Sequence, residues 1–251
     1  LHTPDGQSTL SARHLTLSVK PPDPAATDDL AAAASLLVLA AMTNTHTPGC
    51  SAWLAQQGQT AEATLQAGKA LDLTWQGASV THRTAKVMLG GLHFQIQGGT
   101  PLASATLALS GISYHNVANQ GLLPSDAQAR FTLPSRELAG LMDAIGGRST
   151  ASPAVHTTLS AFTATQGDIR LEGHGSATLT GNVNTTSAQG HLEISNLPEL
   201  IQHARDEQQL KLAAGLALAR LVSHREGERN TWDTIWESGV LTVNGFPLPL
   251  K

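Results

Sequence analysis

The chain has 251 residues, of which 14% are charged and 4% aromatic, and its formal net charge at pH 7 is −4. It is too apolar for a disordered protein and too poor in charge for a helical bundle, which leaves a globular, β-rich protein. Its lysines and arginines are scattered. Because the chain has little with which to neutralise phosphates, we expect no nucleic-acid partner.

The first predicted elements are a strand and two helices. Residues 14–19 alternate apolar and polar side chains, as in a strand with one buried face. Residues 30–42 are uncharged, and as a helix they would be about 20 Å long, shorter than the roughly 30 Å hydrocarbon layer of a membrane. This segment therefore predicts a buried helix, and the composition of residues 51–67 predicts a second one.

From residue 70 the hydrophobic pattern changes to a period of two. Apolar and polar side chains alternate in residues 71–76, 92–97 and 106–110. Two glycine pairs, at residues 90–91 and 98–99, lie between these segments and mark joints. The pattern predicts an antiparallel meander with one solvated face rather than a parallel sheet buried on both sides.

A short amphipathic helix is predicted over residues 135–147, with Ser135 as its N-cap. Strands resume after it and continue through residues 167–195. In this part Gly173 and Gly175 fall on the apolar face. Their missing side chains leave room for strong curvature or for the close approach of another segment, and we expect that segment to be a helix.

The longest predicted helix covers residues 199–223. Its second half, residues 210–222, is apolar nearly all round, which indicates burial on more than one side, at the concave face of the sheet. Trp232 and Trp236 follow, four residues apart and on one face if their segment is helical. The favoured interpretation is that they cap the open end of the core, and the alternative is that they line an apolar groove. Residues 240–250 form the last predicted strand.

The predicted fold is α+β: a long, curved antiparallel sheet, like a half-barrel or a taco, with helices packed on its concave face. Residues 30–42 and 210–222 are the helices expected to cover that face. A single elongated β-rich domain over residues 1–251 is favoured, and two lobes, 1–150 and 151–251, are the alternative.

A family resemblance rests on the hairpin "IRLEGHGSATLTGN…AQGHLEISNLPELI", the apolar helix after it and the terminal "GVLTVNGFPLPL". Residues 168–250 carry this pattern, which resembles an uncharacterised group of Gram-negative envelope proteins that is similar to AsmA-like and YdgA-like proteins. The resemblance implies a periplasmic protein, either free or anchored to the inner membrane by a segment upstream of Leu1. It also implies a twisted sheet that curls around helices or lipid chains, and it supplies no catalytic residue.

No motif in the sequence indicates a catalytic, metal or cofactor site. The eleven histidines are spread along the chain without an HExxH motif. His174 and His191 are expected to face each other across the hairpin as an ordinary cross-strand polar pair. A GxSxG motif is absent, and the single cysteine, Cys50, is expected to be a free thiol without a catalytic role. We therefore expect a protein that is not an enzyme and that has no cofactor.

The expected function is to bind a lipid or another apolar molecule, or to help to move it across the envelope. The alternative is an envelope scaffold whose groove is permanently filled by its own helices. Inner-membrane or other envelope proteins are further candidate partners. The candidate groove residues are Leu210, Ala214, Ala217, Leu218, Leu221, Gly173, Gly175, Trp232 and Trp236.

Overall fold

The computed structural model describes residues 7–20, 24–43, 51–139, 154–180 and 185–248. Its thirteen strands form one open antiparallel sheet. The strands are β1 (Ser8–Ser11), β2 (His14–Lys20), β3 (Ala70–His82), β4 (Ala85–Gln97), β5 (Leu102–His115), β6 (Asp126–Pro134), β7 (Val155–Gln166), β8 (Ile169–Leu179), β9 (Ser187–Ser195), β10 (His224–Glu226), β11 (Arg229–Glu237), β12 (Val240–Val243) and β13 (Phe246–Leu248).

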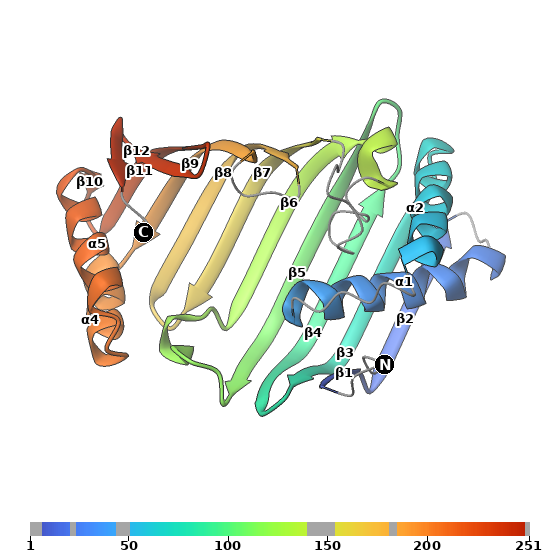
Figure 1. The fold of residues 1–251 in the computed structure, drawn as a ribbon, viewed down its shortest axis with the longest axis horizontal. Helices are drawn as coiled ribbons and strands as arrows, with labels where there is room; N and C mark the ends of the chain where they lie inside the picture. Colours follow the sequence, from blue (N-terminus) through green and yellow to red (C-terminus); the bar gives the residue numbers. More distant parts are fainter. Residues whose placement is uncertain (1–6, 21–23, 44–50, 140–153, 181–184, 249–251) are drawn as a thin grey trace.

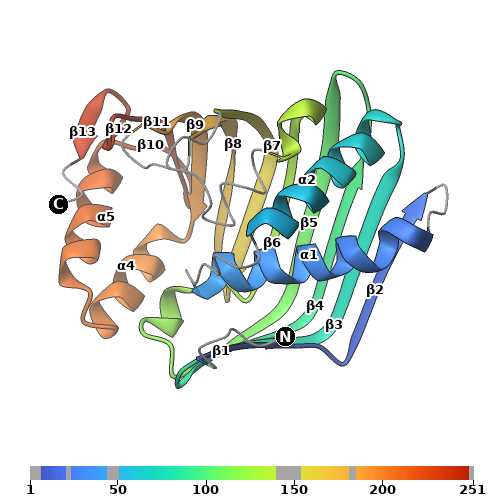
Figure 2. The same ribbon diagram turned by 45° about the vertical axis from the view of Figure 1, so that its right-hand side comes forward.

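The helices all lie on the side toward which the sheet curves (Figures 1 and 2). They are α1 (Pro24–Thr43), α2 (Ser51–Gln66), α4 (Leu197–Asp206) and α5 (Leu210–Leu221), with short 3-10 turns η2 (Gln120–Leu122) and η3 (Ser135–Glu137). The predicted α+β class, with a curved antiparallel sheet and helices on its concave face, is confirmed. In the described part of the chain, no helix is both long and apolar enough to cross a membrane.

The sheet is largely a meander, because each strand from β3 to β9 pairs with the next one in the sequence. β6 pairs with β7 across the point where the two-lobe alternative would divide the chain. Helices are inserted between paired strands at both ends of this meander: α1 and α2 lie between β2 and β3, and α4, α5 and β10 lie between β9 and β11. The alternating pattern of the sequence therefore places one apolar face of nearly every strand toward the helices.

A line of three glycines bends the longest strands. Gly77 on β3 and Gly111 on β5 have positive φ values of 58° and 59°, and Gly90 on β4 lies between them in the register. A Cβ atom on Gly90 would lie 3.2 Å from the carbonyl oxygen of Ser110. The predicted joint at residues 90–91 is therefore wrong: β4 continues through it, because glycine here serves a bend and not a turn.

Two helical pairs cover the two ends of the concave face. One core cluster joins α1 and α2 to strands β2–β6, with Leu65, Ile96 and Leu133 at most 2% exposed. At the opposite end, α4 and α5 pack on β8, β9, β11 and β12 around Leu197 and Trp232. The middle of the concave face, on β6–β9, lies between these clusters (Figure 1).

The predicted long helix over residues 199–223 is wrong in one respect, because the structure divides it into α4 and α5. Gln208 has a positive φ of 60°, and the N–H of Gln209 donates to the carbonyl of Ala204 at 2.7 Å. The Glu207 carboxylate accepts a hydrogen bond from the N–H of Gly121, 3.1 Å away. Folding back at this polar turn lets the apolar faces of both helices reach the same end of the sheet.

Two further local predictions also need correction. The segment with Trp232 and Trp236 is strand β11, and residues 240–250 contain two strands, β12 and β13. Asn244 and Gly245 join them with φ values of 47° and 83°, as expected for a two-residue hairpin turn with positive φ at both positions.

Cys50 lies outside the described residues, and most of the predicted helix over residues 135–147 does so too. The described start of this predicted helix is the 3-10 turn η3. Ser135 is part of that turn, and its hydroxyl donates to the carbonyl oxygen of Gly99 instead of capping the helix. The predicted N-cap is therefore wrong, because this side chain ties the turn to the loop before β5.

Candidate functional site

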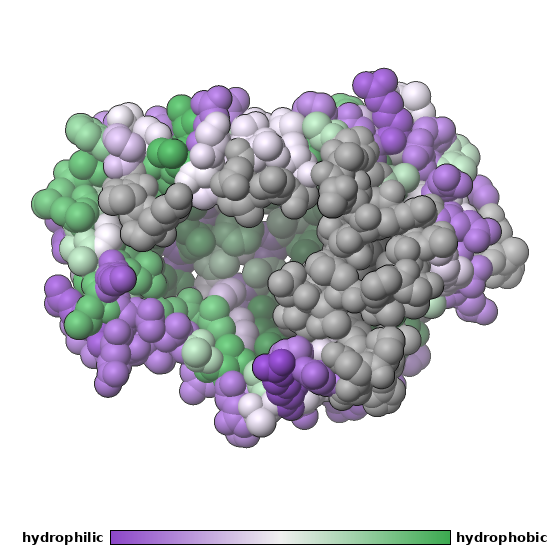
Figure 3. Space-filling view, in the orientation of Figure 1, coloured by the Kyte–Doolittle hydropathy of each residue, from purple (hydrophilic) through white to green (hydrophobic). Residues whose placement is uncertain are grey.

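An apolar groove of about 480 Å³ lies in the middle of the concave face. It is lined by β6, β7, β8, β9, β11 and β12, between the two helical pairs. Figure 3 shows the molecule hollowed here, with hydrophobic residues visible inside the hollow. The volume is within the range of about 300–1,000 Å³ that small-molecule sites occupy.

Small residues in register form the floor of this groove. Gly175 on β8 pairs directly with Gly190 on β9, and in the next row on the same face Ala177 pairs with Ala188. Paired residues of an antiparallel sheet project to the same face. Two adjacent rows therefore lack large side chains where neighbouring positions carry them, and the missing volume forms the groove.

Large apolar side chains form the walls. Phe131, Leu159 and Phe162 stand on the side of β6 and β7, and Trp236 and Leu241 stand on the side of β11 and β12. All five are only partly buried. Burying a fully exposed leucine or phenylalanine gains about 1.5–3 kcal/mol, and covering the part of these side chains that is still exposed gains a fraction of that. The walls therefore favour an apolar occupant.

The groove offers few polar contacts. No Asp, Glu, Lys or Arg is among its lining residues. The two hydroxyls on this face already donate to backbone carbonyls: Thr157 to Thr132 at 3.3 Å, and Thr234 to Gly190 at 3.0 Å. A ligand here would be held by packing rather than by hydrogen bonds or charge.

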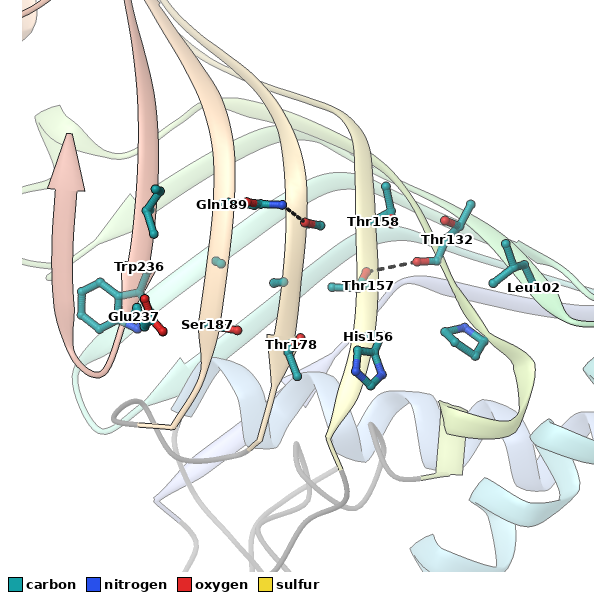
Figure 4. Close-up of a pocket in the computed structure, with 15 residues that line it drawn as sticks. Leu102, Thr132, His156, Thr157, Thr158, Thr178, Ser187, Gln189, Trp236 and Glu237 are labelled. Carbon is teal, nitrogen blue, oxygen red and sulfur yellow. Dashed lines mark hydrogen bonds between the residues drawn. The ribbon is translucent and has the colours of Figure 1, made fainter. Parts of the chain in front are cut away.

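The outer face of the same strands carries a second, polar pocket of about 460 Å³ (Figure 4). Thr158, Ser176 and Gln189 lie in one row across β7, β8 and β9, and Gln189 donates to Ser176 at 3.4 Å. His156 lies 3.2 Å from Glu137. These side chains are those expected on a solvated sheet face, and their arrangement indicates no specific chemistry.

The predicted facing of His174 and His191 is confirmed. They are paired in the register of β8 and β9, and their rings stack with centroids 5.5 Å apart. His191 also lies 2.9 Å from the Asp233 carboxylate. In the described segments, no three His, Cys, Asp or Glu side chains are arranged to hold a metal ion. Strand alternation directs both rings to the outer face, although the two residues are chain neighbours of the floor residues Gly175 and Gly190 and are also among those that line the groove.

One ion pair on the outer face has an electrostatic consequence. Arg170 donates to the Glu172 carboxylate at 2.6 Å. This hydrogen bond, aided by the charges of Arg170 and Arg229, lowers the pKa of Glu172 below its ordinary value near 4.5 although partial burial opposes the shift. A lowered folded-state pKa stabilises the fold above the ordinary pKa, and this stabilisation is lost as the pH falls through the lower value.

We therefore expect Glu172→Gln to destabilise the protein at pH 7 but not at pH 2. Because the pair is exposed and screened, the difference at pH 7 should be at most about 1 kcal/mol. The measurement is the urea midpoint of both proteins at several pH values. Equal destabilisation at pH 7 and pH 2 would assign the effect to lost packing and not to the carboxylate charge.

The predicted groove residues divide between different places. Gly173, Gly175 and Trp236 line the concave groove. Trp232 is 3% exposed and belongs to the core under α5. Leu210 is 68% exposed at the start of α5. The remaining four α5 residues line a different hollow, on the outer side of the α4–α5 pair: Ala214, Ala217, Leu218 and Leu221.

The floor residues Ala177, Ala188 and Gly190 and the wall residues Phe131 and Phe162 are not among those predicted from the sequence. The strand pattern places Ala177 on the same face as Gly175, so part of the floor has a signal in the sequence. The other floor and wall residues lie far apart in the sequence. They can be assigned to one groove only when the pairing of β8 with β9 and of β6 with β7 is known.

Comparison with protein-family models, with curated proteins and with solved structures gives no match for this chain. The similarity to AsmA-like and YdgA-like envelope proteins therefore stays a prediction from the sequence pattern.

Proposed function

We propose that the protein binds the hydrocarbon part of a lipid or of another apolar molecule in the concave groove. The observation that carries this proposal is the groove floor of paired glycines and alanines between walls of partly exposed Phe, Leu and Trp side chains. An uncharged, elongated ligand suits a surface whose hydroxyls are already donated to the backbone. Through the family resemblance, we also propose a periplasmic location and a part in lipid transport.

The proposal is tested by filling the groove. Ala188 lies on the floor next to Trp236 in the register, so Ala188→Phe places a ring in the volume meant for the ligand. We expect the affinity for the fluorescent fatty acid cis-parinaric acid to fall at least about tenfold, the factor that corresponds to about 1.4 kcal/mol. The melting temperature should change little, because the ring enters empty space and not a packed core.

The matched control is Ser187→Phe, which adds the same ring at the neighbouring position of β9 on the outer face. It should retain the affinity of the wild type. Equal loss of probe in both variants would show a general disturbance of β9, and unchanged binding in Ala188→Phe would remove the groove as the ligand site.

The second candidate function is a scaffold with a self-filled groove. It is favoured by one observation: the α1–α2 and α4–α5 pairs already cover both ends of the concave face. Native mass spectrometry of the purified protein separates the candidates. Co-purified lipid that Ala188→Phe removes supports the lipid-binding function, whereas an empty protein that also fails to take up the probe supports the scaffold, with envelope proteins as its partners.

A further inference from the structure

The outward face of α5 is apolar and uncovered. On the inner side, Ala213 is 4% exposed, and Leu216 and Ala219 pack against the same core. On the outer side, Leu218 and Leu221 are 59% and 81% exposed. Leucines so exposed on adjacent turns of one helix are an unusual feature of a solvated surface, and they mark a site of contact with a partner.

The exposed leucines border a hollow of about 920 Å³ between α4 and α5. Its apolar part includes Pro198 and Ile201 of α4 and Ala214 and Ala217 of α5. Figure 3 shows hydrophobic residues gathered at the left edge of the molecule, where α5 lies. The hollow is separate from the concave groove and shares no lining residue with it.

Three arginines also line this hollow: Arg205, Arg220 and Arg225. No carboxylate is among the lining residues, and within the described ranges none forms an ion pair with any of the three. Glu228 lines a small neighbouring pocket together with Arg220 and Arg225. The surface therefore combines exposed apolar side chains with a surplus of positive charge.

The other acids of α4 and of the turn after it are directed elsewhere. Glu199 lies 3.9 Å from His203, Asp206 accepts a hydrogen bond from Gln202, and Glu207 accepts one from the N–H of Gly121. They do not neutralise the arginines of the hollow, so the positive charge is available to a partner.

We propose that the outer face of the α4–α5 pair docks on a bilayer that contains anionic lipids. The leucines of α5 insert at the boundary between headgroups and acyl chains, and the arginines contact lipid phosphates. This combination of apolar residues beside basic ones is typical of helices that lie in a membrane surface. The proposal goes beyond ligand binding in the groove, because it concerns a different surface and requires no occupant of the groove.

Charge distinguishes this occupant from a second copy of the chain. A two-fold dimer through this face would bring the same patch of both copies together. Arg205, Arg220 and Arg225 of one copy would then lie near their counterparts, and like charges that face each other across an interface cost several kcal/mol. An anionic bilayer complements the arginines and also covers the leucines.

The test is co-flotation with vesicles of phosphatidylcholine that contain about 30% phosphatidylglycerol, compared with vesicles of phosphatidylcholine alone. We expect binding to the anionic vesicles that weakens as salt is raised. Arg205→Gln and Arg220→Gln should each lower the partition coefficient about fivefold. Leu218→Ser and Leu221→Ser should each lower it about tenfold or more, because each removes an inserted apolar side chain.

Two matched controls come from the outer face of the sheet. Leu102→Ser changes a leucine that is 53% exposed, and Arg130→Gln removes an exposed arginine on β6; neither should alter vesicle binding. Equal binding to neutral and anionic vesicles would overturn the role of the arginines. Absence of vesicle binding, or unchanged binding of the leucine variants, would overturn the proposal, and a dimer in sedimentation that Leu218→Ser dissociates would assign the face to a second copy.

Discussion

Gly175→Val should lower the free energy of unfolding by about 3 kcal/mol or more, at the upper end of the usual cost of overpacking. A Cβ atom at this position would lie 2.7 Å from the Cα of Gly190 and closer still to the carbonyl oxygen of Gln189. Both are backbone atoms of β9, so no side-chain rotation can relieve the contact. The expected close approach of another segment is thus present, but the segment is a strand and not a helix.

The matched control for this prediction is Gly215→Ala on α5. A Cβ atom there meets nothing within 4 Å, so alanine should stabilise the helix by about 0.5–1 kcal/mol. Urea denaturation of both variants gives the two values. A Gly175→Val protein within about 0.5 kcal/mol of the wild type would show that β9 moves away at little cost, and that the glycines are not required for the close approach of the two strands.

Trp232→Ala should cost about 3–5 kcal/mol, as large-to-small changes of a buried tryptophan do. Trp232 is 3% exposed in the core beneath α5. Its indole N–H donates to the carbonyl oxygen of Ala219 at 2.7 Å, which links β11 to α5 near the end of that helix. The interpretation that Trp232 closes the end of the core therefore matches its position, and its loss should loosen the α4–α5 pair before the rest of the sheet.

Replacement by phenylalanine separates packing from hydrogen bonding. Trp232→Phe removes this donor, and the Ala219 carbonyl then keeps only the hydrogen bond from the N–H of Val222. The lost bond should add about 0.5–1.5 kcal/mol to the cost of the smaller ring. Trp75 is the matched control: it is 1% exposed, and its indole N–H has no hydrogen-bond partner among the described residues. Trp75→Phe should therefore be the milder change in thermal and urea unfolding. Equal costs for the two variants would show that the bond to Ala219 contributes little.

Elements with an unambiguous local period could be predicted from the sequence. Residues 14–19 and the long runs after residue 70 alternate with a period of two, and α1 and α2 have helical composition. Their identity as strands and helices follows from local side-chain direction, which requires no knowledge of distant residues. The α+β class and the meander follow from these elements, because strands that follow one another along the chain usually pair with each other.

Local patterns failed where two structures fit the same spacing. Trp232 and Trp236 are four residues apart, which places them on one face of either a helix or a strand. Pairing with β9 selects the strand. Similarly, the polar residues at 206–209 are compatible with continued helix, and the contact of Glu207 with Gly121 is a tertiary reason for the chain to turn there.

The apolar faces of the strands, the glycines at positions 173 and 175 and the apolar character of residues 210–222 follow from the order of residues alone. The pairing of Gly175 with Gly190 and of Ala177 with Ala188 is visible only in the folded sheet, because register between strands depends on all the pairs of the sheet together. A helix that is apolar nearly all round does not specify which face is covered. In the folded protein the face of α5 that carries Ala213 packs against the core, and Leu218 and Leu221 on the opposite face therefore remain exposed.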